Sequence, residues 1–310
     1  MQVRIKAIRW EAEDILSFIL EPVGGGLMPA FDPGAHIDVQ LAPGLTRSYS
    51  LANDPAIRGH YEIGVHLSPS SRGGSRHIHE RWRAGDIVEI SEPKNNFPMV
   101  EDALHTVLIA GGIGITPMLP MIARLQKLGR SWELHYVAAS PERAAYVAHV
   151  EAHDGVIVCF DGVPGGRRLD LKAISDAAPA DAHLYCCGPS GMLDAFVAIN
   201  KDRPKDHIHI EYFSAETEVA TEGGYTLELA RSGQTIAVQE GETMLDALLG
   251  VGVDIGFACG EGVCGTCEVK VLDGIPDHRD HFLTDEDKAS NRSIMVCCSG
   301  SKSAKLVLDI

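Results

Sequence analysis

The sequence lacks a long apolar segment and lacks an excess of positive charge. None of its 310 residues fall in an apolar run of 18, so no transmembrane helix is expected. Lysine and arginine number 27 against 43 acidic residues, a net charge of −16. Nucleic acid and anionic membranes are therefore not expected as partners, whereas a basic protein surface is. The first ten residues alternate like a strand and hold no signal-peptide core.

Cysteine is also scarce, with eight residues in the chain, and no spaced disulfide framework is present. Four of these cysteines fit a metal centre, and the other four show no pairing pattern. This usage predicts a protein of the reducing cytoplasm. A chain of this length, 45% hydrophobic and 23% charged, is expected to fold as two or three globular domains.

Three cysteines stand in a glycine-rich segment, residues 259–267. Cys259, Cys264 and Cys267 have the spacing C-x4-C-x2-C, and Cys297 follows after 29 intervening residues. This is the plant-type spacing of ligands to a [2Fe–2S] cluster. A zinc ribbon is the alternative, but it pairs two C-x2-C knuckles and only one occurs here. Cys298 competes for the fourth position; Cys297 is preferred for its interval, and because Cys298 would point to the opposite face of a strand.

The first hundred residues contain six short segments that read as strands. Glycine- and proline-rich stretches separate them, which is typical of a small antiparallel barrel. The predicted strands are residues 3–8, 15–20, 35–41, 47–52, 61–67 and 86–91. A β-barrel domain is therefore expected over residues 1–102.

Two parts of this barrel carry groups suited to a phosphorylated, flat ligand. Arg47 and Tyr49 share one strand face, where an arginine can bind phosphate and a tyrosine can stack on a ring. A glycine pair also opens a helix predicted near 75–83, and free amides there attract phosphate. This second part comprises Arg72, Gly73, Gly74 and Ser75. An ordinary strand surface and a plain serine helix cap are the alternatives.

Residues 103–214 alternate strands and helices, as a doubly wound α/β sheet does. The apolar strand 106–110 leads into a glycine turn and a helix near 117–128, which is the ligand end of such a unit. Glycines let the backbone approach a pyrophosphate, and proline suits the first helical turn. The residues concerned are Gly111, Gly112, Gly114 and Pro117. Further strands are predicted at 132–138, 155–160, 182–187 and 207–213, with helices near 142–149, 170–176 and 189–199.

The last hundred residues begin with a polar segment. Residues 215–222 carry three glutamates and no apolar periodicity, so a solvated interdomain linker is predicted. Residues 223–310 are predicted to form an α+β, β-grasp domain around the cluster loop. Its elements are a hairpin of 225–230 and 235–238, a helix near 243–251, and strands at 268–272, 294–298 and 306–310. The segment 277–280 reads either as a charged surface turn or as a polar contact between the cluster and barrel domains.

The barrel motifs together resemble the flavin domain of the ferredoxin–NADP reductase superfamily, whose signature is R-x-Y-[ST] followed by a glycine-rich phosphate loop. The resemblance implies that Arg47, Ser48, Tyr49 and Ser50 embrace the flavin, beside Val65 and His66, and that Arg72 to Ser75 take the phosphate. Cys187, Gly188 and Pro189 resemble the C-G-P motif of the same superfamily, with Cys187 beside the hydride path. Thr116 matches the threonine near flavin N5. Phe213, in preference to Tyr212, is implied to cover the flavin.

Two cofactor choices follow from single residues. Asn95 stands where many FAD-binding members have glycine in P-x-G-x-F, which favours FMN. Glu142 and Asp161 offer acceptors for a free 2′-hydroxyl, whereas Arg143 would suit a 2′-phosphate. NADH is the preferred donor.

Nearly the whole chain resembles the phthalate dioxygenase reductase family, which includes reductases of vanillate-type O-demethylases. The resemblance implies electron flow from NADH through FMN and the cluster to the Rieske centre of a separate oxygenase. Plant-type clusters lie near about −400 mV and Rieske centres at roughly −150 mV and above, so this transfer is downhill. A monomer is implied, whose acidic ferredoxin face docks on the oxygenase. The alternatives are an FAD-containing reductase with a C-terminal ferredoxin for another oxygenase, a non-catalytic iron–sulfur redox sensor, and a passive ferredoxin with a degenerate front half.

Overall fold

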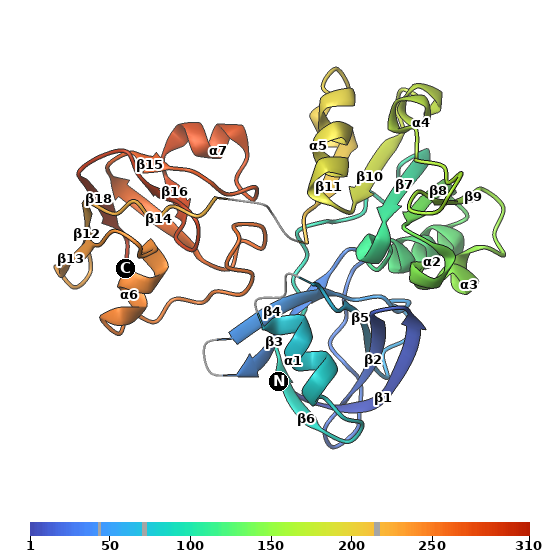
Figure 1. Ribbon diagram of the computed structural model, residues 1–310, viewed down its shortest axis with the longest axis horizontal. Helices are drawn as coiled ribbons and strands as arrows, with labels where there is room; N and C mark the ends of the chain where they lie inside the picture. Colours follow the sequence, from blue (N-terminus) through green and yellow to red (C-terminus); the bar gives the residue numbers. More distant parts are fainter. Residues whose placement is uncertain (43–44, 70–72, 214–217) are drawn as a thin grey trace. The chain divides into compact units, whose positions relative to one another are not determined.

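The chain folds into two compact units, Met1–Phe213 and Ser214–Ile310. The structure is a computed structural model and describes residues 1–42, 45–69, 73–213 and 218–310. Figure 1 shows the ribbon of both units. Each unit has its own buried hydrophobic clusters. Within the described ranges, no helix has the length and apolar character needed to cross a membrane.

Six antiparallel strands form the first sheet of the larger unit, in the order β4-β3-β6-β1-β2-β5. They are β1 (Gln2–Ala12), β2 (Ile15–Pro22), β3 (His36–Ala42), β4 (Leu45–Ser50), β5 (Tyr61–His66) and β6 (Ile87–Ile90). A bridge between Leu51 and Ile63 joins the end of β4 to β5 and closes the sheet around its apolar side chains. Helix α1 (Gly74–Arg81) lies beside β3 and β4 (Figure 1). The prediction of six short antiparallel strands is confirmed.

A five-stranded parallel sheet forms the rest of the larger unit, in the order β11-β10-β7-β8-β9. The strands are β7 (His105–Gly111), β8 (Ser131–Ala138), β9 (Val156–Phe160), β10 (His183–Cys187) and β11 (Ile208–Glu211). The helices are α2 (Met118–Leu128), α3 (Val147–Val150), α4 (Leu171–Ala177) and α5 (Ser190–Ile199), with 3-10 turns η1 (Gly112–Ile115), η2 (Pro141–Arg143) and η3 (Lys205–His207). Alternate β7 side chains explain the layering: Leu108 packs with α2 on one face, and Val107 packs with α4 and α5 on the other.

The helix predicted near 142–149 is wrong. The chain forms the short η2 and α3 instead, because Ala144 is extended and Tyr146 adopts a left-handed φ of 61°. Ala145 and Tyr146 are both buried, at 0% and 3% exposure. Burial of these side chains outweighs local helix propensity, which is a weak determinant of conformation.

The smaller unit is built on a five-stranded sheet in the order β13-β12-β18-β14-β16, with a separate pair β15-β17. The strands are β12 (Tyr225–Leu229), β13 (Thr235–Val238), β14 (Glu268–Asp273), β15 (Pro276–Asp277), β16 (Ser293–Met295), β17 (Gly300–Ser301) and β18 (Lys305–Leu308). Helix α6 (Met244–Gly250) buries Met244 and Leu248 against this sheet. Helix α7 (Asp285–Ser290) was not predicted, although Thr284 begins it with a capping box to Asp287.

Two further predictions for this unit are wrong. The strand predicted at 294–298 ends at Met295, so Cys297 and Cys298 lie in a turn. The second correction concerns the linker: Ala220 is 3% exposed, and its N–H donates to the Cys298 carbonyl at 2.9 Å. Residues 218–222 are therefore anchored to the smaller unit through Ala220, although Glu218, Thr221 and Glu222 are exposed. Residues 215–217 lie outside the described residues. Ala220 fits here because Gly300, with no side chain, lies under its methyl group.

Candidate functional site

The predicted phosphate-binding groups of the barrel lie together. The side chain of Arg47 on β4 crosses the start of α1, where a methyl group built on Gly74 would lie 2.6 Å from Arg47 Cγ. Gly73 precedes the helix with a φ of 92°, and the Ser75 hydroxyl accepts the Ser68 N–H at 3.2 Å. Arg72 lies outside the described residues. A guanidinium and a helix N-terminus thus converge, a combination that suits an anion.

The next residues of β4 face a polar group that sequence reasoning missed. Ser48 donates its hydroxyl hydrogen to Asp38 at 2.6 Å, and Lys94 pairs with the same carboxylate at 2.6 Å. Asp38 is only 7% exposed, so Lys94 compensates its buried charge. Nothing in the spacing links position 38 to 94; the β3 register and the bridge between His36 and Lys94 bring them together. Tyr49 is half-buried against the barrel cluster, and burial raises the pKa of its hydroxyl.

Strand β5 and the segment after β6 supply the remaining barrel candidates. Val65 is buried in the barrel cluster, and its carbonyl lies 2.9 Å from His79 Nε2. His66 is half-buried, and burial lowers its pKa. Asn95 forms a local turn, since its side chain accepts the Phe97 N–H at 3.0 Å and donates to the Pro33 carbonyl at 3.0 Å. A glycine could make neither contact, so Asn95 fixes this turn with its side chain.

The glycine turn and the C-G-P motif interlock at the carboxyl ends of β7 and β10. A methyl group on Gly114 would overlap the Cys187 carbonyl, and one on Gly111 would lie 2.8 Å from Pro189 Cδ. A methyl group on Gly188 would in turn lie 3.1 Å from the Gly111 backbone. Gly112 has a φ of 55°, and Pro117 caps α2. These glycines therefore allow two backbone segments to touch at the ligand edge of the sheet.

Thr116 connects this edge to the barrel. Its hydroxyl donates to the Ile113 carbonyl at 3.0 Å, and it is 2% exposed. A methyl on Gly64 of β5 would be 2.8 Å from Thr116 Cγ2 and 2.9 Å from Tyr146 Oη. The parallel sheet thus approaches the strand that carries Val65 and His66.

Glu211 is the main residue of this region to which the sequence analysis gave no role. It ends β11 and pairs across the sheet with Cys187. Burial raises the pKa of Glu211 to about 8, and a hydrogen bond with Ser50 opposes that shift. Its Oε2 is buried and has no partner among the described residues. Burial, with the Glu211 and Cys186 charges, also raises the pKa of Cys187. Ser50, Cys187 and Glu211 therefore converge from three strands.

A carboxylate at the end of the last predicted parallel strand was the available signal for Glu211. Such groups at the carboxyl ends of strands border ligand sites. The two aromatic residues that follow it separate. Tyr212 packs on the α4–α5 face and donates to Asp194 at 3.3 Å, whereas Phe213 packs on the opposite face, against the hydrophobic cluster that includes α2.

The four predicted cluster ligands lie in the smaller unit, where Cys259 contacts both Cys264 and Cys297. Cys259 Sγ accepts the Glu261 N–H at 3.3 Å. The pKa of Cys264 is raised, chiefly by its contact with the Cys259 thiol and secondly by burial. The Cys259 thiol also contacts Cys297, while Cys267 and Cys297 are 2% and 4% exposed. Buried, converging thiols with an amide aimed at sulfur fit a [2Fe–2S] cluster.

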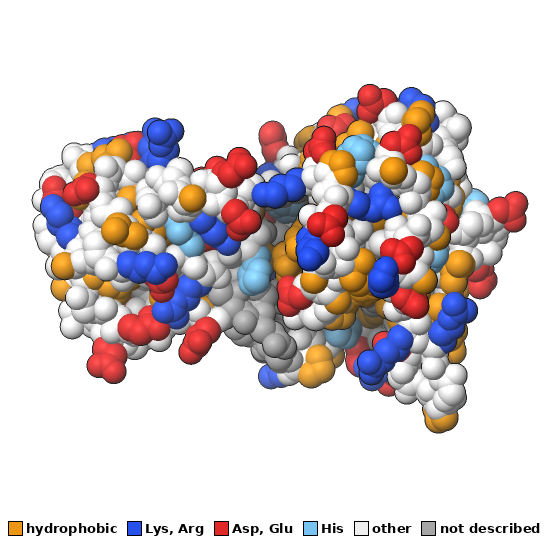
Figure 2. Space-filling model, turned by 90° about the horizontal axis from the view of Figure 1, so that it is seen from above, with side chains coloured by type: hydrophobic (Ala, Val, Ile, Leu, Met, Phe, Trp, Pro, Cys, Tyr) orange, Lys and Arg blue, Asp and Glu red, His pale blue; other side chains and the backbone are white. Residues whose placement is uncertain are grey.

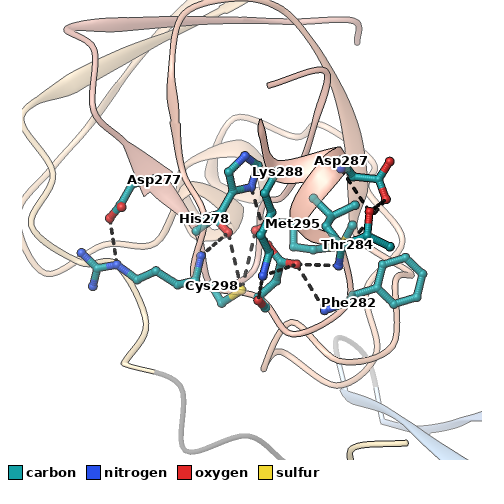
Figure 3. A network of polar contacts seen from close by, with 12 residues as sticks. Asp277, His278, Phe282, Thr284, Asp287, Lys288, Met295 and Cys298 are labelled. Atoms are coloured by element: carbon teal, nitrogen blue, oxygen red, sulfur yellow. Dashed lines mark hydrogen bonds and ion pairs between the residues drawn. The ribbon is translucent and has the colours of Figure 1, made fainter. Parts of the chain in front are cut away.

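Cys298 also lies close to the cluster loop, and its thiol contacts that of Cys297. A methyl on Gly262, whose φ is 70°, would lie 2.5 Å from Cys298 Sγ. Figure 3 shows Cys298 within a polar network beside His278, Met295 and Lys288. In that network the buried Asp280 carboxylate accepts the amides of Phe282 and Leu283 at 3.2 and 2.8 Å. The preference for Cys297 thus keeps support from the Cys259 contact, while its strand-face argument fails because no strand reaches these residues.

The segment 277–280 is anchored within the smaller unit through Arg279. Arg279 binds Asp277 at 2.9 Å and Glu222 at 2.7 Å, and both partners belong to the smaller unit. Throughout the described ranges, no three histidine, cysteine or acidic side chains are placed to hold a single metal ion. A two-iron cluster differs from such a site because its four thiolates are shared between two metal atoms.

Known proteins are similar to this chain over its full length. A family model described as "2Fe-2S iron-sulfur cluster binding domain" matches residues 227–301. The phenoxybenzoate dioxygenase subunit beta of Ectopseudomonas oleovorans is 50% identical over 100% of this chain and 97% of its own. A vanillate O-demethylase oxidoreductase of Pseudomonas sp. (strain HR199 / DSM 7063) is 42% identical over 100% of both chains. The solved phthalate dioxygenase reductase has a TM-score of 0.78 and 35% identity, covering 100% of this chain and 98% of its own.

These similarities define an oxidoreductase that carries a 2Fe–2S ferredoxin-type domain. The chain belongs to the phthalate dioxygenase reductase family, the reductase components of oxygenase systems.

Proposed function

We propose that this protein carries electrons from NADH through FMN to its [2Fe–2S] cluster, and then to the Rieske centre of a separate aromatic-ring oxygenase or O-demethylase. One observation carries the proposal: the chain joins four cysteines with cluster spacing to a unit where Ser50, Cys187 and Glu211 meet at the carboxyl edge of a parallel sheet. The two curated relatives named above are components of a dioxygenase and an O-demethylase.

The proposed division of the chain follows its sheets. Residues 1–102 are the antiparallel FMN-binding barrel, 103–214 the doubly wound NADH-binding domain, 215–222 the connection, and 223–310 the β-grasp ferredoxin domain. We assign the FMN phosphate to the converging groups of Arg47, Gly73, Gly74 and Ser75, together with Arg72. The isoalloxazine ring is assigned to Tyr49, Ser50, Val65, His66 and Phe213.

The residues at the carboxyl edge have distinct roles in this proposal. Bound flavin would supply the conversion between hydride chemistry and single-electron chemistry. Gly111, Gly112 and Gly114 leave room for the pyrophosphate of the nucleotide, and Gly188 and Pro189 shape the facing turn. Cys187 and Thr116 line the nicotinamide position with small buried groups that exclude water. Glu211 stays protonated at neutral pH, because its pKa lies near 8, and holds that proton beside Ser50.

The choice of NADH is supported by the partners of Arg143. Its guanidinium binds Glu13 at 2.9 Å and Asp14 at 3.3 Å. A basic group already held by two carboxylates is poorly placed to recognise a 2′-phosphate. The absence of a disulfide among the eight cysteines supports a reducing, cytoplasmic location.

The acidic excess of the smaller unit supports docking on a basic partner. Residues 223–310 contain 14 acidic residues and 7 lysines and arginines. On the face that Figure 2 shows, acidic and basic side chains are interspersed. The charge excess therefore favours steering of the approach over a single large acidic patch.

The direct test is mass spectrometry of the heat-released flavin, with iron quantification and NADH-driven reduction of an artificial acceptor. FMN with about two irons per chain and NADH activity is the expected result. FAD with the same iron would move the protein to the rival reductase group. Bound cofactors without NADH activity would instead favour the redox sensor, and absent flavin would overturn the barrel assignment.

A further inference from the structure

The segment just before the first strand of the smaller unit is anchored beside the fourth cysteine. We name residues 218–222 the strap. Ala220 donates its N–H to the Cys298 carbonyl at 2.9 Å, and the Thr221 carbonyl accepts the Gly241 N–H at 2.7 Å. Ala220 is 3% exposed, with its methyl packed on Gly300. The strap is thus attached to the turn that carries Cys297 and Cys298.

One side chain holds the strap from outside. The Arg279 guanidinium donates to Glu222 Oε1 at 2.7 Å, to the Glu218 carbonyl at 3.3 Å and to Asp277 Oδ2 at 2.9 Å. The backbone N–H of Arg279 donates to the Ser299 hydroxyl at 3.2 Å. Figure 3 shows Asp277 at the edge of the polar network around Cys298. The Arg279 side chain is 23% exposed and Asp277 is 25% exposed, so this pair is only partly screened by solvent, whereas Glu222 is 66% exposed.

The strap sets how much chain separates the two units. Only residues 214–217 stand between Phe213 and the strap. Fully extended, that stretch spans at most about 18 Å, whereas a connection that includes the released strap spans at most about 36 Å. The effective concentration of two tethered groups falls as roughly the −3/2 power of the connecting length. Doubling the length therefore lowers the encounter frequency about threefold.

We propose that Arg279 is a positioning residue for electron transfer: by holding the strap, it keeps the connection short and so keeps the cluster unit within reach of the flavin unit. This inference rests on the proposed function, because it concerns transfer between the two cofactors. Replacing Arg279 removes its bonds to Glu222, to the Glu218 carbonyl and to Asp277, so the strap loses its side-chain anchor. This role is separate from cluster binding, because the predicted ligands of the cluster are four cysteines and Arg279 is not one of them.

The test compares Arg279→Gln with Arg231→Gln in the full-length holoprotein. Arg231 makes an equivalent pair with Asp309 at 3.0 Å on the same unit, so it controls for the lost charge. Hydrogen exchange measures release of the strap at Ala220, and stopped-flow absorbance measures cluster reduction after NADH mixing. Arg279→Gln is expected to expose the Ala220 amide and slow cluster reduction about threefold, with iron content and cluster potential unchanged. Arg231→Gln is expected to change neither rate.

A second variant covers the case in which Arg279→Gln folds poorly. Inserting five glycine or serine residues after Phe213 in the wild-type chain lengthens the connection and leaves the strap intact. The insertion is expected to slow cluster reduction by a similar factor and to add little when combined with Arg279→Gln. Exposure of the strap without a change in rate, or an insertion without effect, would overturn the proposal. Wild-type protein that shows no NADH-driven cluster reduction would refute the proposed function instead, while the exchange result would still report on the strap.

Discussion

The Glu211 carboxyl group couples the fold of the larger unit to pH. Its pKa is raised to about 8 by burial, above the ordinary 4.5. Between these values the unfolded chain has lost the proton and the folded chain retains it. The free energy of unfolding therefore falls as the pH rises through this window, by up to about 1.4 kcal/mol per pH unit. We expect Glu211→Gln to remove that slope between pH 5 and 8, as measured by urea unfolding.

The matched control is Glu89→Gln, which makes the same change on an exposed strand position. Its stability profile should parallel that of the wild type. Equal slopes for wild type and Glu211→Gln would show that Glu211 ionises normally in the folded protein. In that case the carboxyl group beside Ser50 would not be protonated at neutral pH.

The adjacent cysteines of the turn after β16 give a second test at the scale of single residues. The Cys259 thiol contacts Cys297, whereas Cys298 lies against Gly262 and the Met295 carbonyl. Cys297→Ala is therefore expected to abolish cluster assembly, and Cys298→Ala to retain about two irons per chain. The second variant should lose roughly 1–2 kcal/mol of stability, because it empties a buried sulfur site.

Iron quantification and visible absorbance of the two variants, purified anaerobically, decide the assignment. Retention of the cluster by Cys297→Ala together with its loss from Cys298→Ala would reverse it. Loss from both variants would show that packing of the turn, rather than one thiolate, limits assembly.

At the scale of elements, the contact between η1 and the end of β10 shapes the carboxyl edge of the parallel sheet. The Cβ of an alanine at position 114 would overlap the Cys187 carbonyl. The turn must then move, at a cost of about 1–3 kcal/mol. Gly114→Ala is expected to raise the KM for NADH several-fold in steady-state assays, since the displaced turn crowds the pyrophosphate.

Gly191→Ala in α5 is the control, because nothing lies within 4 Å of the added methyl group. It should leave KM unchanged and stabilise the protein slightly, by restricting the unfolded chain. A Gly114→Ala enzyme with normal KM and stability would mean that the turn has space that the structure does not show.

The elements that were predictable share a local cause. Alternating or continuous apolar runs bounded by glycine and proline located most strands of the three large sheets. The failures arose where tertiary contacts decide: Tyr146 is buried at the expense of a helix, and Ala220 is buried where polar neighbours suggested solvent. Asp38 and Lys94 meet only through strand register, and Ser50 meets Glu211 only through assembly of two sheets. Spacing along the chain contains no signal for such pairs.

For the whole molecule, separate cores predict separate unfolding. The hydrophobic core of the smaller unit is formed by buried residues between positions 225 and 308. The buried residues of the other three hydrophobic cores lie between positions 3 and 196. Units with independent cores need not unfold in one transition. We therefore expect two transitions by calorimetry. Because all four predicted ligands of the iron–sulfur cluster lie in the smaller unit, removal of iron should lower the Tm of that unit's transition by several degrees.

The other transition serves as the internal control and should keep its Tm after iron removal, while release of the proposed flavin should lower the Tm of this transition alone. A single transition that moves as a whole when either cofactor is removed would contradict the prediction. It would also bear on the strap, because two units that unfold together must share more than the short connection at residues 214–217. Two independent transitions, in contrast, would leave the length of that connection as the main determinant of how often the cofactors meet.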